Sequence, residues 1–332
     1  MPPTFSKFDT FYGPLTDFNF SSDKLMGSTP LECGNDLNFL ANVRDKQNTF
    51  LAIRGDWSQS LPPSNYDTYI ITNLGEAADH NWLERINQFP GRKIIITSQH
   101  TGDTINSNNT TYFYMEHMHW YTKLSFDWFS KQYRKPLADR QFNFGCLNGR
   151  PDWHKEEILK TLLDNYKNLQ YTWLEDPINP NYQCKYKIPI QKVDGHGWTS
   201  NNHIYNDCKL IWVTESLCDS IDNKLQGYIT EKTIKPIVSK CMFIMIGQRL
   251  SYARLRGLGF ETFEDHFGIN WDEEWDFERV EYTKNLIRNF DFDLNQQDLV
   301  DYNYDYFYNK FFDVIDKRNT QMKEQILEFI NG

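Results

Sequence analysis

Residues 227–236, which read Gly-Tyr-Ile-Thr-Glu-Lys-Thr-Ile-Lys-Pro, carry the side chains best suited to chemistry. Thr230 is expected to cap a helix over 229–239, leaving backbone N–H groups and the positive end of the helix dipole for an anion. Lys232 adds a full positive charge, and the carboxylate of Glu231 is suited to accept hydrogen bonds from ribose or sugar hydroxyls. The segment therefore predicts a site for a phosphate-linked sugar. An ordinary capped helix with solvated Glu and Lys side chains would have the same sequence.

A second group of polar residues follows two other predicted strands. Asn148-Gly149-Arg150 ends one strand and Glu215 ends another. Glycine permits a close approach of the backbone to a phosphate, and the guanidinium of Arg150 can neutralise a pyrophosphate through two parallel hydrogen bonds. His154 is placed to assist departure of a leaving group, but a surface histidine is the favoured interpretation. The predicted ligand-binding residues are Asn148, Gly149, Arg150, Glu215, Tyr228, Thr230, Glu231 and Lys232.

The elements that position these residues alternate between strands and helices. In the first part of the chain we expect strands over 49–53, 66–72, 93–97 and 111–120 and a helix over 79–89, in which Trp82, Ile86 and Phe89 share one face. A strand, a helix and a strand with short connections are typical of a parallel sheet.

The pattern restarts after a polar stretch, residues 131–140, which we interpret as a linker. Further strands are expected over 142–147, 171–174, 210–213 and 242–246, and further helices over 153–166, 229–239, 250–257, 276–289 and 309–330. The predicted fold class is α/β, with two Rossmann-like doubly wound domains facing a cleft and with C-terminal helices. The expected domains span 1–140 and 141–290, followed by a helical segment over 291–332. Ligands of such sheets bind beyond the carboxyl ends of the strands.

The composition is that of an ordinary folded protein, with 39% hydrophobic and 24% charged residues. A net charge of −10 argues against a surface that grips nucleic acid through its phosphates alone, although a local basic face is compatible with this charge. No window of ~18 apolar residues occurs, so no membrane partner is expected. Six cysteines without a CxxC pair suit a reducing cytoplasm.

The motif Tyr-Ile-Thr-Glu-Lys, followed by Lys-Pro-Ile and an apolar strand, resembles the donor-site motif Tyr-x-Thr-Glu-Lys of α1,3-fucosyltransferases. This resemblance implies the GT-B fold of two Rossmann domains, with contacts from Tyr228, Glu231 and Lys232 to a nucleotide-sugar. Those enzymes carry a comparable Asn/Arg turn, but its spacing differs here. Residues 142–290, with Phe-Gly-Cys-Leu-Asn-Gly-Arg-Pro-Asp-Trp-His and Val-Thr-Glu-Ser, also resemble largely uncharacterised glycosyltransferase-like proteins of tailed phages of marine bacteria.

Sugar transfer to a hydroxyl requires a base whose pKa lies near 7. The first half of the chain offers Asp56, Glu76, His100 and Glu116 at the ends of predicted strands, and Asp56 and Glu116 are the preferred catalytic candidates. A Glu-His-Met-His sequence begins at Glu116 and has the letters of a metal site. Because successive strand residues point to opposite faces, we expect no metal there.

Other cofactor chemistry has little support in the sequence. Asp291-Phe-Asp293 has the letters of the Asp-x-Asp metal motif of single-domain glycosyltransferases, but it lies between predicted helices and is interpreted as a solvated loop. A GT-B enzyme instead stabilises the departing diphosphate with basic side chains and a helix dipole. Arg150 and Lys232 suit that role, helped by Lys235 or Arg254. The absence of GxGxxG and Walker motifs disfavours a dinucleotide oxidoreductase and a kinase.

These patterns predict a glycosyltransferase that moves a sugar from a nucleoside diphosphate sugar to an acceptor hydroxyl, without a metal or another cofactor. The second domain is expected to hold the donor and the first domain the acceptor. The resemblance to phage proteins suggests a hydroxymethylated DNA base or a surface glycan as acceptor, and the acidic charge balance disfavours DNA. Two alternatives stay open: a non-catalytic nucleotide- or sugar-binding module, and a virion-associated structural protein.

Overall fold

The computed structural model describes residues 12–17, 37–53, 64–73, 86–97, 109–116, 134–149, 151–173, 184–189, 202–216, 218, 227–268 and 276–332. The chain forms two compact units. Unit 1 contains Met1–Trp120 and Asp313–Gly332, and unit 2 contains Tyr121–Ser220 and Gly227–Phe312. The C-terminal helical segment is therefore divided between the units, and residues 134–140 of the expected linker belong to unit 2.

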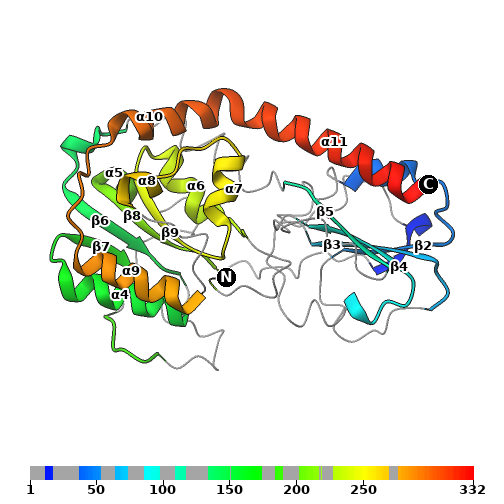
Figure 1. Cartoon of the computed structure of the whole chain (residues 1–332), viewed down its shortest axis with the longest axis horizontal. Helices are drawn as coiled ribbons and strands as arrows, with labels where there is room; N and C mark the ends of the chain where they lie inside the picture. Colours follow the sequence, from blue (N-terminus) through cyan, green and yellow to red (C-terminus); the bar gives the residue numbers. More distant parts are fainter. Residues whose placement is uncertain are drawn as a thin grey trace, which may run out of the picture. The chain divides into compact units, whose positions relative to one another are not determined.

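Unit 1 is built on a sheet in the order β1-β2-β3-β4-β5, of which Figure 1 labels the last four strands. Its strands are β1 (Tyr12–Pro14), β2 (Thr49–Ile53), β3 (Thr68–Asn73), β4 (Arg92–Thr97) and β5 (Thr110–Tyr114). The first strand is antiparallel to β2, and the other strands are mutually parallel. Leu51 pairs with Ile70 and Ile70 with Ile94, so an apolar row crosses the centre of the sheet.

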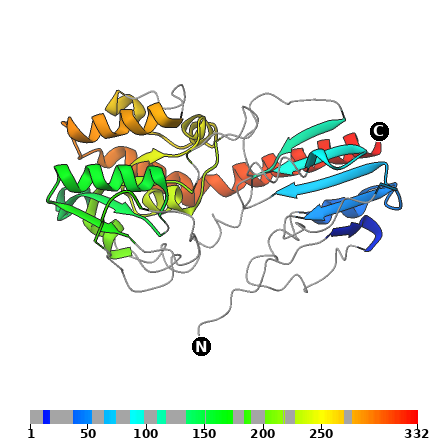
Figure 2. The same ribbon diagram turned by 90° about the horizontal axis from the view of Figure 1, so that it is seen from below.

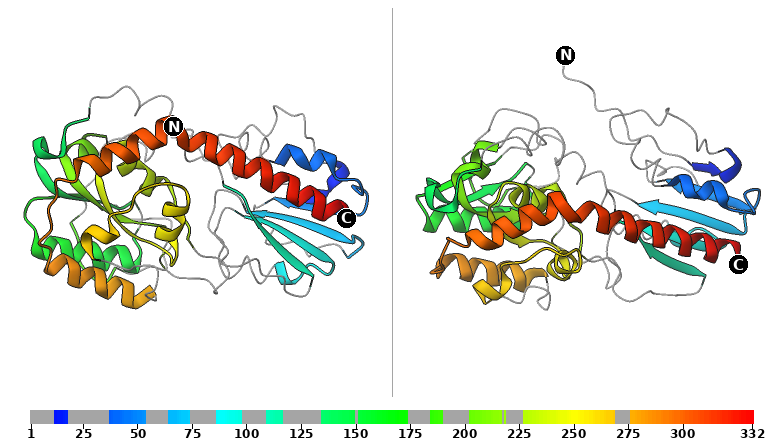
Figure 3. Two further views of the ribbon diagram at one scale, coloured as in Figure 1. Left: turned by 45° about the horizontal axis from the view of Figure 1, so that its top comes forward. Right: turned by 90° about the horizontal axis from the view of Figure 1, so that it is seen from above.

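Both faces of this sheet are covered, as apolar parallel strands require. On one face, Leu51, Ile70 and Ile94 pack with Ile326 of α11 (Phe312–Asn331). The short 3-10 turns η1 (Leu15–Asp17) and η2 (Asn38–Asn42) complete that layer. Ile86 and Phe89 pack on the opposite face. Both views of Figure 3 show α11 in red along the sheet of unit 1.

Unit 2 contains a parallel sheet in the order β7-β6-β8-β9. Its strands are β6 (Phe142–Leu147), β7 (Leu169–Thr172), β8 (Cys208–Thr214) and β9 (Met242–Ile246). From β6 the chain first adds β7 on one side and then returns to add β8 on the other. This reversal of direction between β6 and β8 is a topological switch point, and ligands of doubly wound sheets bind at the carboxyl ends of the strands there.

Helices cover both faces of the sheet in unit 2. On one face α4 (Trp153–Asn165) packs against α9 (Asp276–Arg288), and Figure 2 shows the two side by side. On the other face lie α5 (Asn202–Asp207) and α6 (Glu231–Val238), with α10 (Gln297–Tyr306) against α6. Two shorter helices, α7 (Ser251–Gly257) and α8 (Glu264–Phe267), follow β9. A π-helical segment, η4 (Phe307–Phe311), joins α10 to α11.

A buried arginine joins the start of the unit 2 sheet to the ends of two helices. Arg140, which precedes β6 and lies in the expected linker, is 4% exposed. Its guanidinium donates to the carbonyl oxygens of Tyr205 and Cys208 at 2.8 Å and to those of Ser239 and Lys240 at 3.0 and 2.9 Å. These carbonyls lie at or just after the ends of α5 and α6, where helical carbonyls lack partners within the helix. Arg140 therefore fixes two helices to the start of the sheet.

The fold class expected from the sequence, two α/β units with parallel sheets followed by C-terminal helices, is confirmed. The strands expected over 49–53, 142–147 and 242–246 have the predicted bounds. The strand expected over 111–120 ends at Tyr114. Most of the helix expected over 79–89 lies outside the described residues. The helical tail begins at Gln297, earlier than predicted, because α10 and η4 lead directly into α11.

Candidate functional site

The switch point of unit 2 is held together by Asn148, which directly follows β6 and is 2% exposed. Its side-chain Oδ1 accepts from the hydroxyl of Thr214 at the end of β8. Its backbone N–H donates to the carbonyl oxygen of Thr172 at 3.2 Å and to the Thr172 hydroxyl at 2.9 Å. Asn148, predicted to bind the ligand, therefore joins the carboxyl ends of three neighbouring strands through its backbone and its Oδ1 atom.

The next residue, Gly149, provides open space at the same edge. It is exposed, and a Cβ atom added there would meet no atom within 4 Å. Arg150, the predicted pyrophosphate contact, lies outside the described residues. Gly149 thus marks the place where a ligand can approach the backbone next to the switch point.

The first turn of α6 has the predicted cap. Thr230 adopts extended backbone angles, and its hydroxyl accepts from the backbone N–H of Lys232 at 3.2 Å. The N–H of Thr233 reaches the carbonyl oxygen of Thr230 at 3.2 Å, and the N–H of Thr230 reaches Oε1 of Glu215 at 3.1 Å. These three N–H groups already have acceptors, so the expectation that the turn leaves donors free for an anion is wrong for them.

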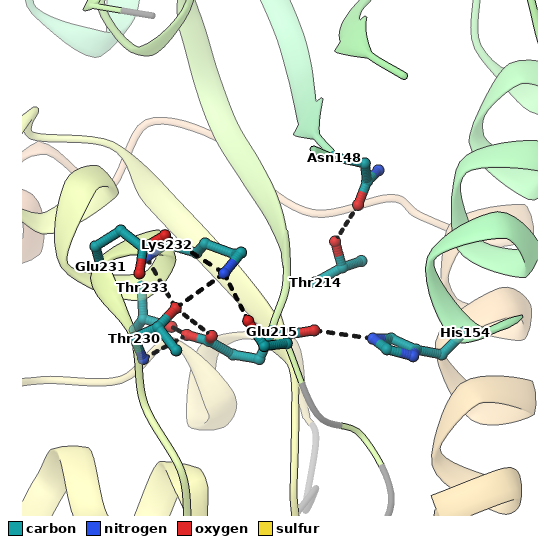
Figure 4. A network of polar contacts seen from close by, with 9 residues as sticks. Asn148, His154, Thr214, Glu215, Thr230, Glu231, Lys232 and Thr233 are labelled. Atoms are coloured by element: carbon teal, nitrogen blue, oxygen red, sulfur yellow. Dashed lines mark hydrogen bonds and ion pairs between the residues drawn. The ribbon is translucent and has the colours of Figure 1, made fainter. Parts of the chain in front are cut away.

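Glu231 and Lys232 are the partly accessible charges of this turn, with side chains 17% and 26% exposed. The ammonium of Lys232 contacts Oγ of Ser216 at 2.8 Å, Oγ1 of Thr230 at 3.3 Å and Oε1 of Glu231 at 3.4 Å (Figure 4). Burial raises the pKa of Glu231, but Lys232 and Lys235 outweigh it and hold that pKa below its ordinary value. Glu231 is therefore ionised at neutral pH and able to accept hydroxyl hydrogens.

Lys235, one turn further along α6, is 7% exposed. Burial lowers its pKa to about 8, although Glu231 and Glu215 act in the opposite direction. Lys235 is thus a second cation of α6 and stays mostly protonated at neutral pH.

The carboxylate of Glu215, predicted to bind the ligand, is completely buried. Its Oε2 accepts from the Thr230 hydroxyl at 2.5 Å, and its Oε1 accepts from the Thr233 hydroxyl. Three donors, counting the Thr230 N–H, satisfy an anion that burial would otherwise make costly. Glu215 therefore joins the end of β8 to the first turn of α6, as Figure 4 shows.

His154, in the first turn of α4, is 1% exposed, so the expectation of a surface histidine is wrong. Its Nε2 lies 2.9 Å from the carbonyl oxygen of Glu215. Because a carbonyl oxygen only accepts, Nε2 carries the hydrogen. Burial lowers the pKa of His154 to about 4. The charge of Asp152 raises this pKa, whereas the charges of Lys155 and Lys232 lower it further. The ring is therefore neutral at physiological pH.

Tyr228 is 5% exposed, and its backbone N–H donates to Oε1 of Gln248 at 3.2 Å. The preceding Gly227 has a φ of 74°, in the left-handed region that favours glycine. Arg254 donates to the carbonyl oxygen of Gly227 at 2.7 Å. The approach to α6 is thus fixed by α7 and by the loop that follows β9.

The candidate bases of unit 1 are only partly described. Glu116 follows β5, is 2% exposed, and its carboxylate accepts from the hydroxyl of Tyr114. Its backbone N–H and carbonyl oxygen both bind the side-chain amide of Asn319 in α11, at 2.9 and 2.8 Å. Asp56, Glu76, His100 and the histidines after Glu116 lie outside the described residues.

Among the residues that the structure describes, no group of three His, Cys, Asp or Glu side chains is arranged to hold a metal ion. Asp291 and Asp293 are exposed in the loop between α9 and α10, as predicted for a solvated loop. No helix within the described parts of the chain is long and apolar enough to cross a membrane.

Sequence reasoning did not identify Thr214, Ser216 and Thr233 as part of the site. Their positions carried a usable signal, because Thr214 and Ser216 flank Glu215 at a strand end and Thr233 lies three residues after the helix cap. A hydroxyl at each of these places is suited to local hydrogen bonds.

No protein-family model matches the chain, and no curated protein matches it. Among solved structures it is similar to an α1,3-fucosyltransferase with GDP, at 12% identity and a TM-score of 0.44, over 85% of this chain and 78% of that chain. A second α1,3-fucosyltransferase structure has 13% identity and a TM-score of 0.37, over 81% of this chain and 80% of that one. AviGT4, a glycosyltransferase involved in avilamycin A biosynthesis, has 11% identity and a TM-score of 0.36, over 81% of this chain and 76% of that chain. Such low values carry no conclusion about ligand or reaction, and the resemblance to phage proteins stays a prediction.

Proposed function

We propose that the chain is a glycosyltransferase that moves a sugar from a nucleoside diphosphate sugar to an acceptor hydroxyl. The observation that carries this proposal is the position of Lys232 and Glu231. They are the partly exposed charges of the α6 first turn, which Glu215 ties to the carboxyl end of β8 at the switch point of unit 2. Doubly wound sheets bind nucleotides at this place. The resemblance of residues 228–232 to the fucosyltransferase donor motif supports the same assignment.

The charges suit the chemistry of a departing diphosphate. The ammonium of Lys232 makes its longest contact, 3.4 Å, with Glu231, and this is the contact it can most readily exchange for a phosphate oxygen. Glu231 would then be free to accept a hydroxyl hydrogen of the ribose or the sugar. The nearby cation of Lys235 strengthens the positive potential that stabilises negative charge on the leaving group. Arg150, the residue after Gly149 in the sequence, is proposed as the second phosphate contact.

Asp56 and Glu116 are proposed as candidates for the base, with a hydroxymethylated DNA base or a glycan hydroxyl as acceptor. Changing each carboxylate to its amide, Asp56→Asn and Glu116→Gln, tests the assignment. The true base variant should lose transfer while it retains donor binding, measured by release of nucleoside diphosphate in the presence of acceptor.

One observation favours a second candidate function, a nucleotide- or sugar-binding module without catalysis. Glu116 is 2% exposed and its carboxylate is bonded to Tyr114, an arrangement less suited to taking a proton from a substrate. Such a module would bind nucleotide-sugars but would neither hydrolyse nor transfer them.

The first experiment is a thermal-shift screen of the whole chain against UDP-, GDP-, CMP- and TDP-sugars, followed by calorimetry on any sugar nucleotide that stabilises it. A Glu231→Ala variant should bind that donor more weakly and lose its hydrolysis or transfer. If no sugar nucleotide raised the melting temperature or bound by calorimetry, the proposed function would be wrong. Binding without turnover, across acceptors of both classes, would favour the module.

A further inference from the structure

The hydrogen bonds of Thr230 have a fixed polarity. A hydroxyl has one hydrogen and two lone pairs. The hydrogen of Thr230 goes to Oε2 of Glu215, at 2.5 Å, because the two Lys232 groups at the same oxygen are N–H donors and cannot accept it. Both lone pairs therefore remain for Lys232, which approaches the same oxygen with its backbone N–H at 3.2 Å and its ammonium at 3.3 Å. The orientation of one hydroxyl thus decides whether Lys232 has an acceptor at this point.

Glu215 is itself held from two sides. Its backbone N–H donates to the carbonyl oxygen of Ile246 at the end of β9, at 2.8 Å. Its carbonyl oxygen accepts from Nε2 of the buried His154 at 2.9 Å. A Cβ atom on Gly247 would lie 3.3 Å from Cβ and Cγ of Glu215, so the glycine leaves room for the stem of this side chain. The ends of β9 and α4 therefore fix the main chain of Glu215, and Thr230 and Thr233 fix its carboxylate.

From this geometry we propose that Glu215 is a positioning residue for Lys232, acting through the Thr230 hydroxyl, and that it never contacts the ligand. The inference rests on the proposed function, because it takes Lys232 as the contact for a nucleoside diphosphate. It assigns Glu215, predicted to bind the ligand directly, a different role. The carboxylate is completely buried and occupied by three protein donors, whereas Lys232 is 26% exposed.

The isosteric variant Glu215→Gln separates this role from a simple effect of charge. Removing a buried negative charge beside the site would, by electrostatics alone, strengthen the binding of an anion. The hydrogen bonds of Thr230 lead us to expect weaker binding of the anion instead. In this variant the amide oxygen would accept from the Thr230 N–H and from the Thr233 hydroxyl. The amide nitrogen would then point an N–H at the Thr230 oxygen. Both lone pairs of that oxygen are already used by Lys232. The ammonium would then lose that acceptor.

The first measurement needs no ligand. Brief treatment with acetic anhydride, read by mass spectrometry, reports the reactivity of Lys232 relative to Lys160 of α4 in the same molecule. Reactivity at Lys232 should rise several-fold in Glu215→Gln and in Thr230→Val, which removes the hydroxyl with little change of shape. Thr230→Ser retains the hydroxyl and should retain the protection of Lys232. The matched control is Glu156→Gln, another carboxylate that is 1% exposed in unit 2, and it should leave Lys232 unchanged.

The second measurement is calorimetric binding of GDP, UDP, CDP and TDP to the whole chain. Affinity for the diphosphate that binds should fall roughly tenfold in Glu215→Gln, the effect of one hydrogen bond to a charged group. In a Lys232→Ala background the same change should have no further effect, because residues that act through one another are not additive. Circular dichroism and melting temperature establish that each variant is folded.

Unchanged labelling of Lys232 in both Glu215→Gln and Thr230→Val would overturn the inference, as would tighter diphosphate binding in Glu215→Gln. A loss of affinity that persists in full without Lys232 would also overturn it. If the wild-type chain bound none of the four diphosphates, the proposed function would fail, while the labelling result would still decide whether Glu215 positions Lys232.

Discussion

Nε2 of His154 donates to the carbonyl oxygen of Glu215 across 2.9 Å, joining the first turn of α4 to the end of β8. The two residues are 1% and 0% exposed. Because the bond uses the main chain of Glu215, the side chain stays available for Thr230 and Thr233. One residue thus connects a helix on one face of the sheet to a helix on the other.

The stability of the protein should depend on pH through His154. The folded pKa is about 4, against an ordinary value of 6.5, so the unfolded chain binds more protons between these values and stability falls as pH decreases through this window. The contribution of this histidine should drop by about 2 kcal/mol between pH 7 and pH 5. Urea unfolding of wild type and His154→Gln at both pH values measures it, and an equal pH dependence in the two proteins would contradict the prediction.

Removing the ammonium of Lys232 should weaken donor binding strongly. Lys232→Ala is expected to lose about 10- to 100-fold in affinity for a nucleoside diphosphate, as for one hydrogen bond to a charged group. Lys160→Ala, on α4 and paired with Asp164, serves as the control and should bind normally. Isothermal calorimetry decides between the outcomes, and full affinity without Lys232 would remove it from the site.

Arg140 should be among the residues on which the stability of unit 2 depends most. Arg140→Met leaves the carbonyl oxygens at the ends of α5 and α6 without their donor, and we expect a loss of about 3–5 kcal/mol. Arg288→Met, an exposed position on α9, should change the free energy of unfolding little. A small change at Arg140 in denaturant unfolding would show that water replaces the guanidinium.

Asn319 should hold α11 to the end of β5. Its amide binds both the N–H and the carbonyl oxygen of Glu116, at 2.9 and 2.8 Å, so Asn319→Ala removes these two buried hydrogen bonds. A loss of about 2 kcal/mol is expected, with faster hydrogen exchange around Glu116. Gln321→Ala, exposed on the same helix, is the matched control. Equal exchange in both variants would argue against this role.

The main strands were predictable because each is a short apolar run bounded by polar residues. The runs at 142–147 and 242–246 have no competing helical pattern, and the strands end where predicted. The Thr230 cap was equally predictable, since hydroxyl residues are preferred before the first turn of a helix.

Burial at the site was not predictable from local sequence. Glu215 follows a strand end, a place usually solvated, and becomes buried only because α6 brings Thr230 and Thr233 against it. His154 is polar and precedes Lys155, which suggests a surface, yet the carbonyl oxygen of Glu215 accepts its hydrogen from 61 residues away. Such contacts depend on the order of strands in the sheet, which the sequence pattern does not specify.

The position of α11 bears on how the chain folds during synthesis. The core of unit 1 includes Ile326, so its first strands cannot complete their hydrophobic layer until residues made more than two hundred positions after β5 have left the ribosome. Unit 2 is complete by Phe312. Domains generally fold as units, in the order of their synthesis. Because Ile326 completes the core of unit 1, we expect unit 2 to become fully packed before unit 1 during synthesis.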